Sequence, residues 1–395
     1  MTTRSGRRVR KIRATRIAAS IGLLALLAGC AASEPEASPA ATSPAPAPSP
    51  VPSADPPQPM AGAPELPEAT TAPQEVLTDL DTPWGLAFLP SGAVLVTSRN
   101  TGAVLLLSDT GTAVLTGPGA DELTGTAFGG EGGLLGVAVS PAFETDRLVY
   151  LYRTMPDGNQ VVRAELDALA ASLAPLQVVI GGIPAAGNHN GGRIAFGPDG
   201  LLYVATSDAV NPAFAQDPGS LGGKILRLTA DGAPAPGNPT EGSPVWSLGH
   251  RNVQGLGWDP DGRMFASEFG QSTFDELNLI EPGANYGWPE VEGMGGGPGF
   301  VEPLVTWSTA DASPSGIAVT PDGVYLAALR GARLWWVPFA GDGVGEATPF
   351  LTGELGRLWN VVLGPDGALW ILTQNTDGRG TPQPGDDRLL RMLPP

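Results

Sequence analysis

Residues 193–208, RIAFGPDGLLYVATSD, have the sequence pattern of a β-hairpin. A short apolar run (194–196) and a longer one (201–206) flank the turn Pro198-Asp199-Gly200, and such a turn between two apolar runs is typical of paired antiparallel strands. The same pattern occurs six times in the 395-residue chain, with turn prolines at positions 90, 141, 198, 260, 321 and 365. The chain is therefore predicted to repeat one β-unit six times.

The spacing of these turns indicates the architecture. Each interval leaves room for a four-stranded sheet, and a third strand is expected after several hairpins, at 103–107, 224–228 and 333–337. Six such sheets can bury their faces only against one another, in a ring. We therefore predict an all-β, six-bladed β-propeller with four-stranded antiparallel blades. A pair of eight-stranded β-sandwiches is the alternative, and the regular turn spacing counts against it.

The N-terminal region has the composition of an export signal. Seven basic and no acidic side chains occur in the first sixteen residues, and a mainly apolar segment then ends in Leu27-Ala28-Gly29-Cys30. This ending resembles a bacterial lipobox, which predicts lipidation of Cys30, the only cysteine, and anchoring to the outer face of the cell membrane; the alternative is an ordinary secretory signal. We assign residues 1–30 to a lipoprotein signal peptide, 31–72 to a disordered Pro/Ala/Ser-rich linker, and 73–395 to the propeller.

The charge of the chain narrows the range of partners. Removing the seven basic residues changes the formal net charge from −18 to −25 (−18 − 7). Such a chain is a poor ligand for nucleic acid or anionic lipid, and is compatible with bound Ca²⁺. With 55 glycines and 41 prolines, few helices are expected, and residues 164–173 are the one helical candidate.

One hairpin carries candidate catalytic residues. His189 precedes its first strand and Asp208 follows its second, so both are expected at the same edge of the sheet. A base and the carboxylate that orients it are often arranged in this way. The alternative is a surface histidine beside a turn aspartate.

Four further loops carry polar side chains. Glu131 begins a glycine-rich loop, and residues 248–255 combine Arg251 with two amides. Residues 268–288 are rich in the oxygen donors that Ca²⁺ requires, and Arg330 and Arg357 follow later strands. Taken singly, such residues are more often solvated or part of tight turns.

Taken together, these motifs resemble one family, the pyrroloquinoline quinone (PQQ)-dependent glucose/sorbosone dehydrogenases, including their aldose sugar dehydrogenase branch. The resemblance extends from about residue 77 to the C-terminus. It is carried by the stretches EGGLLGVAVSPAF, NHNGGRIAFGPDGLLYVATSD, LGHRNVQGLGWDPDG, SEFGQSTFDELNLIEPGANYGWP and DDRLLRM.

The resemblance implies PQQ-dependent oxidation of an aldose at C1 to a lactone, assisted by Ca²⁺, with electrons passing to an unidentified acceptor. It assigns each candidate residue a role. Catalysis falls to His189, Asp208 and Arg251; cofactor binding to Arg251, Asn252, Gln254, Arg330 and Arg357; substrate contact to Glu131 and Asn188; and metal binding to Gly270, Gln271, Glu276 and Tyr286.

Two departures from the family pattern keep alternatives open. Trp359 occupies the place of a second cofactor-binding arginine, and Asn188 replaces an aspartate of the glucose-oxidising branch. A catalytically inactive propeller that binds a ligand or the cell wall is therefore one alternative, and a Ca²⁺-dependent propeller lactonase is another. The histidine–aspartate hairpin and Arg251 favour the dehydrogenase. His250, which precedes Arg251, has no expected acidic partner.

Overall fold

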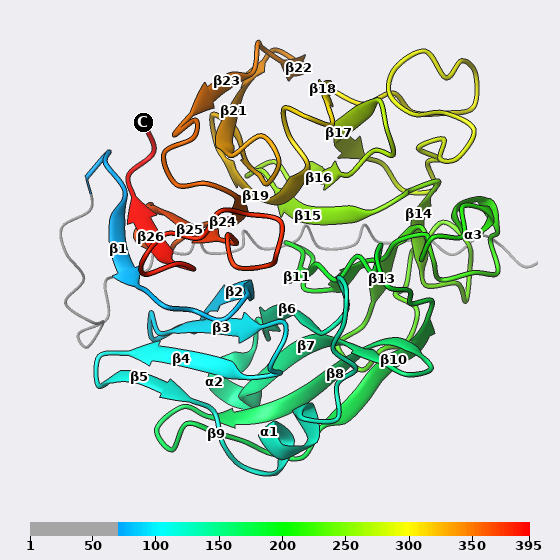
Figure 1. Cartoon of the computed structure of the whole chain (residues 1–395). Coiled ribbons are helices and arrows are strands. Elements are labelled where there is room, and N and C mark those ends of the chain that lie inside the picture. The colour runs from blue at the N-terminus through cyan, green and yellow to red at the C-terminus, as the bar shows by residue number, and fades with distance from the viewer. Residues whose placement is uncertain (1–69) are drawn as a thin grey trace, which may run out of the picture. The chain divides into compact units, whose positions relative to one another are not determined.

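Six antiparallel sheets confirm the predicted six-bladed β-propeller (Figure 1). The computed structural model describes residues 70–395. Blade one contains β2 (Pro83–Phe88), β3 (Val94–Ser98), β4 (Val104–Ser108) and β5 (Gly111–Val114). Blade two contains β6 (Leu134–Val139), β7 (Leu148–Met155), β8 (Gly158–Asp167) and β10 (Gln177–Ile183), and the short β9 (Ser172–Leu173) pairs with β8. Blade three contains β11 (Ile194–Phe196), β12 (Leu202–Ala205), β13 (Lys224–Leu228) and β14 (Val245–Leu248). Blade four contains β15 (Val253–Trp258), β16 (Met264–Glu268), β17 (Phe274–Ile280) and β18 (Val305–Ser308). Blade five contains β19 (Pro314–Thr320), β20 (Gly323–Ala328), β21 (Arg333–Ala340) and β22 (Gly343–Val344), and β23 (Thr348–Phe350) pairs with β21. Blade six contains β24 (Leu358–Leu363), β25 (Leu369–Thr373), β26 (Leu389–Met392) and β1 (Gln74–Leu77).

The first strand of each blade lies next to the first strands of its two neighbours. These strands, labelled β2, β6, β11, β15, β19 and β24, surround the centre of the ring (Figure 1). The last of them, β24, contacts the first, β2, so the ring is closed. Closure of the ring leaves each sheet with both faces covered, as the sixfold repeat of the hairpin predicts.

The apolar core is divided among the six boundaries between blades. Each boundary holds its own cluster of buried residues, such as Leu95 with Leu151 between blades one and two, and Leu326 with Phe265 between blades four and five. Period-2 alternation places such side chains on both faces of every sheet, because each blade has two neighbours. The core therefore consists of six layers that hold the loops at the ring's ends in fixed positions.

Blade six joins the two ends of the described chain. β1 pairs antiparallel with β26, with Gln74 opposite Arg391 and Leu77 opposite Leu389. Val76 and Leu77 pack against the apolar cluster between blades six and one. The first strand of the propeller thus completes its last blade.

The helix expected at residues 164–173 is wrong. This segment contains the end of β8 and all of β9. Ala164 and Leu166 are buried whereas Glu165 and Asp167 are exposed, which is the two-residue alternation of a strand. The short helices of the described residues lie elsewhere: α1 (Pro118–Leu123), α2 (Phe143–Asp146) and α3 (Ala213–Gln216). The third strands predicted for blades one, three and five are confirmed as β4, β13 and β21.

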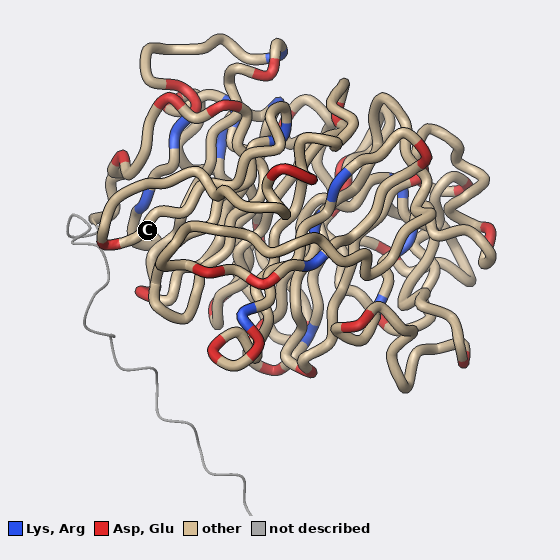
Figure 2. The backbone as a smooth tube through the Cα atoms, turned by 90° about the horizontal axis from the view of Figure 1, so that it is seen from below, with Lys and Arg blue, Asp and Glu red and all other residues tan. Residues whose placement is uncertain are grey.

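Acidic residues predominate over basic ones along the tube in Figure 2 and lie mostly in its outer loops. Among residues 70–395, no helix is long and apolar enough to cross a membrane. The predicted signal peptide, the Pro-rich linker up to residue 69 and the lipidation site Cys30 lie outside the described residues.

Candidate active site

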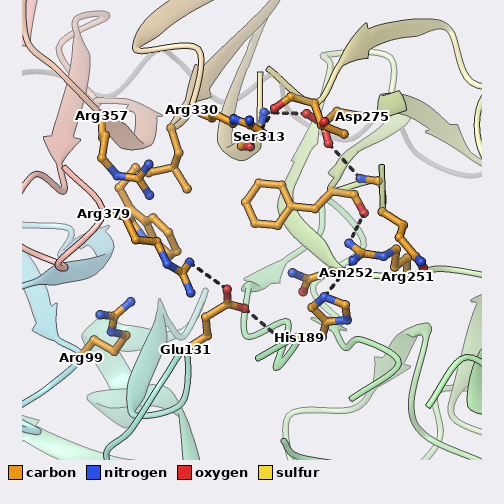
Figure 3. A pocket seen from close by; sticks show the side chains of 16 residues that line it. Arg99, Glu131, His189, Arg251, Asn252, Asp275, Ser313, Arg330, Arg357 and Arg379 are labelled. Atoms are coloured by element: carbon orange, nitrogen blue, oxygen red, sulfur yellow. Dashed lines mark hydrogen bonds and ion pairs between the residues drawn. The ribbon is translucent and has the colours of Figure 1, made fainter. Parts of the chain in front are cut away.

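A polar cavity lies where loops from all six blades meet (Figure 3). Its volume is about 400 Å³. Every contributing loop either precedes the first strand of a blade or follows the second, so the repeated hairpin brings distant sequence segments to one end of the ring. Each blade contributes at least one titratable side chain, namely Arg99, Glu131, His189, Arg251, Arg330 and Arg357 in blade order.

His189 and Asp208 are in direct contact. His189 Nδ1 lies 2.7 Å from Asp208 Oδ1, as the hairpin predicted. The other carboxylate oxygen accepts a hydrogen bond of 2.9 Å from the indole Nε1–H of Trp288, and Oδ1 also accepts one from the Val210 backbone. Burial opposes ionisation of Asp208, but these hydrogen bonds outweigh it and lower its pKa below the usual value.

The contact with Arg251 identifies the tautomer of His189. Arg251 Nη2 lies 2.9 Å from His189 Nε2. A guanidinium carries donors only, so Nε2 must be the acceptor and Nδ1 must carry the proton that is shared with Asp208. The lone pair of the imidazole is therefore on Nε2 and accepts from Arg251, which also lines the cavity; an unprotonated Nε2 is what a general base requires.

Glu131 holds the backbone of the same histidine. Its Oε2 accepts a hydrogen bond of 2.9 Å from the His189 N–H, and its Oε1 pairs with Arg379 at 3.0 Å. His189 has a φ of +61°, a conformation that is unfavourable for a residue with a Cβ. Contacts on three sides (Glu131, Asp208 and Arg251) hold it there. The imidazole is thus positioned by three different blades.

The expectation that His250 lacks an acidic partner is wrong. His250 Nδ1 lies 2.9 Å from Glu268 Oε2, and its Nε2 lies 2.8 Å from Ser247 Oγ. His250 precedes β15 and Glu268 ends β16, so blade four repeats the histidine–carboxylate arrangement of blade three. His250 is fully buried with both ring nitrogens engaged. Glu268 also accepts a hydrogen bond from the Arg251 backbone, so this pair supports Arg251.

Five arginines of the described chain line the cavity, against two carboxylates, Glu131 and Asp275. Sequence reasoning missed two of the five, Arg99 and Arg379. Arg99 directly follows β3, the second strand of its hairpin, just as Arg330 comes shortly after β20. Position relative to the repeat was therefore the signal that could have identified Arg99.

The loop after β16 exposes carbonyl groups beside the cavity. Glu292 Oε1 accepts hydrogen bonds from four consecutive backbone N–H groups, at residues 271–274, over 2.7–3.2 Å. In a planar trans peptide the carbonyl points opposite to the N–H, so the carbonyls of Gly270 and Gln271 point away from Glu292. Both residues line the cavity. Such oxygen donors suit a hard cation such as Ca²⁺.

Asp275 lines the cavity beside this loop. Its carboxylate accepts hydrogen bonds from the backbone N–H of Gly270, at 2.9 Å, and of Ser313, at 2.6 Å. Burial nevertheless raises the pKa of Asp275 to about 6. The carboxylate thus ties the start of the loop to blade five.

Glu276 and Tyr286, the other predicted metal ligands, lie outside this cavity. They line a separate space of about 10 Å³ together with Glu268 and Glu292. Burial, followed by the charge of Glu268, raises the pKa of Glu276 to about 7. Within the described chain, no three His, Cys, Asp or Glu side chains have a metal-binding arrangement. A cation here would depend on backbone carbonyls as well as carboxylates.

Three other residues singled out in the sequence have distinct positions. Gln254 is buried and does not line the cavity, and it contacts Asn252 and Ser315. Asn188 is exposed and does not line the cavity. Trp359 does line it, and its ring meets Trp84 edge-on at 5.5 Å. The roles predicted for Gln254 and Asn188 stay predictions.

Comparison with known proteins identifies the family. The sequence pattern described as "Glucose / Sorbosone dehydrogenase" matches residues 80–391. The chain belongs to this family of PQQ-dependent sugar dehydrogenases. It is 49% identical to the aldose sugar dehydrogenase of Streptomyces coelicolor, whose structure is described as the PQQ-bound form, with 82% of this chain and 98% of that one covered and a TM-score of 0.77.

Two further relatives agree. A putative oxidoreductase (glucose dehydrogenase) from Thermus thermophilus is 44% identical, with 82% of this chain and 99% of that one covered and a TM-score of 0.75. The aldose sugar dehydrogenase of Escherichia coli K12 is 31% identical over 77% of this chain and 90% of its own length. The resemblance inferred from the sequence motifs is thus confirmed at the level of the family.

Proposed function

We propose that this chain oxidises aldose sugars at C1 to lactones, with PQQ as the cofactor. The observation that carries the proposal is the imidazole of His189, whose proton is held on Nδ1 by Asp208 and whose Nε2 faces the cavity. A sugar hydroxyl that reaches Nε2 must take the place of Arg251 Nη2. His189 then accepts the hydroxyl proton, and Asp208 stabilises the imidazolium that forms.

The cavity suits a flat cofactor with several carboxylates. Three of the guanidinium groups that line it, those of Arg251, Arg330 and Arg357, are assigned to the cofactor, and guanidinium groups bind carboxylates through paired hydrogen bonds. Two buried donors that face this region, Arg251 Nε and Asn252 Nδ2, have no hydrogen-bond partner within residues 70–395. Buried donors normally have partners, so the site has polar groups to spare for a ligand. Trp359 adds an aromatic surface for stacking.

PQQ, when bound, supplies the quinone that accepts the hydride from C1. Arg251 lies beside His189 and would stabilise negative charge that develops next to the imidazole during the reaction. Ca²⁺, when bound, supplies a positive charge next to the cofactor, and the carbonyls of Gly270 and Gln271 are the ligands we assign to it. Arg330 and Arg357 are assigned to the cofactor's carboxylates.

The inactive binding protein had one observation in its favour, the replacement of a family arginine by Trp359. The pairing of His189 with Asp208 and the position of Arg251 next to the imidazole favour the dehydrogenase. The electron acceptor and the lipid anchor at Cys30 also remain proposals.

A reconstitution experiment tests the function. The purified full-length protein is loaded with PQQ and Ca²⁺ and assayed for dye-linked oxidation of aldoses. We expect activity that depends on both additions. His189→Ala should lower kcat by at least about a hundredfold, the contribution of a general base, while the absorption spectrum of bound quinone persists. Wild-type protein that binds PQQ but oxidises no aldose would refute the proposal.

A further inference from the structure

The cavity of the proposed active site adjoins a second one of about 410 Å³. Arg99 and Arg379 line both, and the second cavity is otherwise bordered by Asn100, Phe128, the Gly129-Gly130 turn and Asp377. The two arginines therefore stand at the junction of the two spaces. In Figure 3 both guanidinium groups lie on the same side of the cavity as Glu131.

Arg99 is a buried cation without a paired anion. Only 5% of its surface is exposed. Its Nε donates a 3.0 Å hydrogen bond to Asn100 Oδ1, but its terminal nitrogens form no hydrogen bond or ion pair with any residue in the range 70–395. Burying an unpaired charge is costly. A bound anion would compensate for this cost, and both cavities give access to the guanidinium.

The acids near Arg99 are already engaged. Asp377 pairs with Arg357 at 3.2 Å and is 2% exposed, and its other oxygen accepts from the Arg379 backbone. Glu131 uses one oxygen for the His189 backbone and the other for Arg379. Arg379 uses one terminal nitrogen in this pair and is 57% exposed, so its other donors are available. The junction thus has spare donors, whereas every oxygen of these two carboxylates already accepts one hydrogen bond.

Glu131 fixes the distance between this junction and the base. A single carboxylate joins the backbone of His189 to the guanidinium of Arg379. Because Arg379 and Arg99 line the same cavity as His189, a sugar whose C1 hydroxyl reaches His189 can extend its far side toward these two arginines. Phe128, 40% exposed at the second cavity, offers an apolar surface to a sugar ring there.

We propose that Arg99 and Arg379 recognise an anionic substituent of the substrate, so that the preferred aldoses are acidic sugars such as uronic acids. The inference rests on the proposed oxidation at C1, and the substituent takes no part in that reaction. The chain as a whole repels anions because its net charge is −18. The two arginines therefore form a local site of opposite sign that distinguishes an acidic sugar from a neutral one.

Matched ligands test this inference without turnover. Methyl β-D-glucuronide and methyl β-D-glucoside differ in one carboxylate, and neither carries the free C1 hydroxyl that is oxidised. Calorimetry on the full-length protein should show that the glucuronide binds at least about tenfold more tightly, as expected for one charge-assisted hydrogen bond. Arg379→Gln and Arg99→Gln should each remove the difference while binding of the glucoside stays within about twofold. The 6-phosphate of the glucoside distinguishes a carboxylate site from a general anion site.

The outcomes separate this inference from the proposed function. Equal affinity for the two glycosides in the wild type would overturn the inference alone if neutral aldoses are still oxidised. A loss of PQQ binding in Arg379→Gln would also overturn it, because the arginines would then belong to the cofactor. Arginine-dependent binding of the glucuronide without oxidation of any sugar would support the acidic-sugar site and refute the dehydrogenase.

Discussion

Replacing Asp208 by Asn tests how the base is held. In the wild type, Oδ1 accepts hydrogen bonds from His189 Nδ1 and the Val210 backbone, and Oδ2 accepts one from Trp288 Nε1. An asparagine has one oxygen for these three donors. The oxygen will face the two donors near Oδ1, so its NH₂ group will face the indole N–H.

The size of the effect follows from this geometry. One buried donor loses its partner, which should lower the free energy of unfolding by about 1–3 kcal/mol. The hydrogen bond to His189 is kept, but its acceptor is no longer charged. We expect this change to raise the activation free energy by about 1–2 kcal/mol, which lowers kcat by about 5- to 30-fold. The loss in rate should therefore be smaller than in His189→Ala.

A double-mutant cycle isolates the contact with the indole. Trp288→Phe removes the indole donor, so Asp208→Asn should cost at least about 1 kcal/mol less in that background than in the wild type. Urea unfolding gives the free energies, and dye-linked sugar oxidation gives kcat. Additive effects of the two substitutions on stability would refute the contact between Asp208 and the indole. A loss in kcat as large as that of His189→Ala would refute the assignment of Asp208 as the residue that orients the base.

Three further predictions concern pH, metal and localisation. The pKa of Asp208 is lowered on folding, so its contribution to stability should be present above about pH 4 and lost as the pH falls further; urea midpoints of wild type and Asp208→Asn should converge on acidification. Chelation of Ca²⁺ with EGTA should weaken PQQ binding in a spectroscopic titration, and unchanged affinity would exclude the proposed role of the Gly270 and Gln271 carbonyls. Cys30→Ala should move the protein from the membrane fraction to the soluble fraction, and a membrane-bound variant would contradict lipidation.

The propeller could be predicted because the sequence features that specify it are local and repeated. Each hairpin shows its strands by alternation and its turn by Pro and Gly, and six copies leave a closed ring as the simplest way to bury both faces of every sheet. The same logic placed His189 beside Asp208, since a short hairpin returns to the edge from which it started. The helix expected at 164–173 failed because Ala164 and Leu166 alternate with exposed residues, which marks a strand.

The rest of the site depends on contacts that no local pattern contains. Arg379 lies on the long loop between β25 and β26, and its partner Glu131 is 248 residues away. The indole of Trp288 reaches Asp208 from a loop 80 residues further along the chain. The acidic partner of His250 was missed for a different reason. Glu268 stands at the end of β16 as Asp208 follows β12, but it was interpreted as part of a metal-binding loop.

The pairing of β1 with β26 has a consequence for how the protein is made. Gln74 emerges from the ribosome long before its partner Arg391, so no nascent chain can close its ring until synthesis is nearly complete. Until then β25 and β1 lack β26, the strand that pairs with both, and the boundary between blades six and one stays open. An unfinished chain is therefore kept from its final fold by its own topology. Loss of only the last few residues, which include β26, would leave the ring open in an otherwise complete molecule.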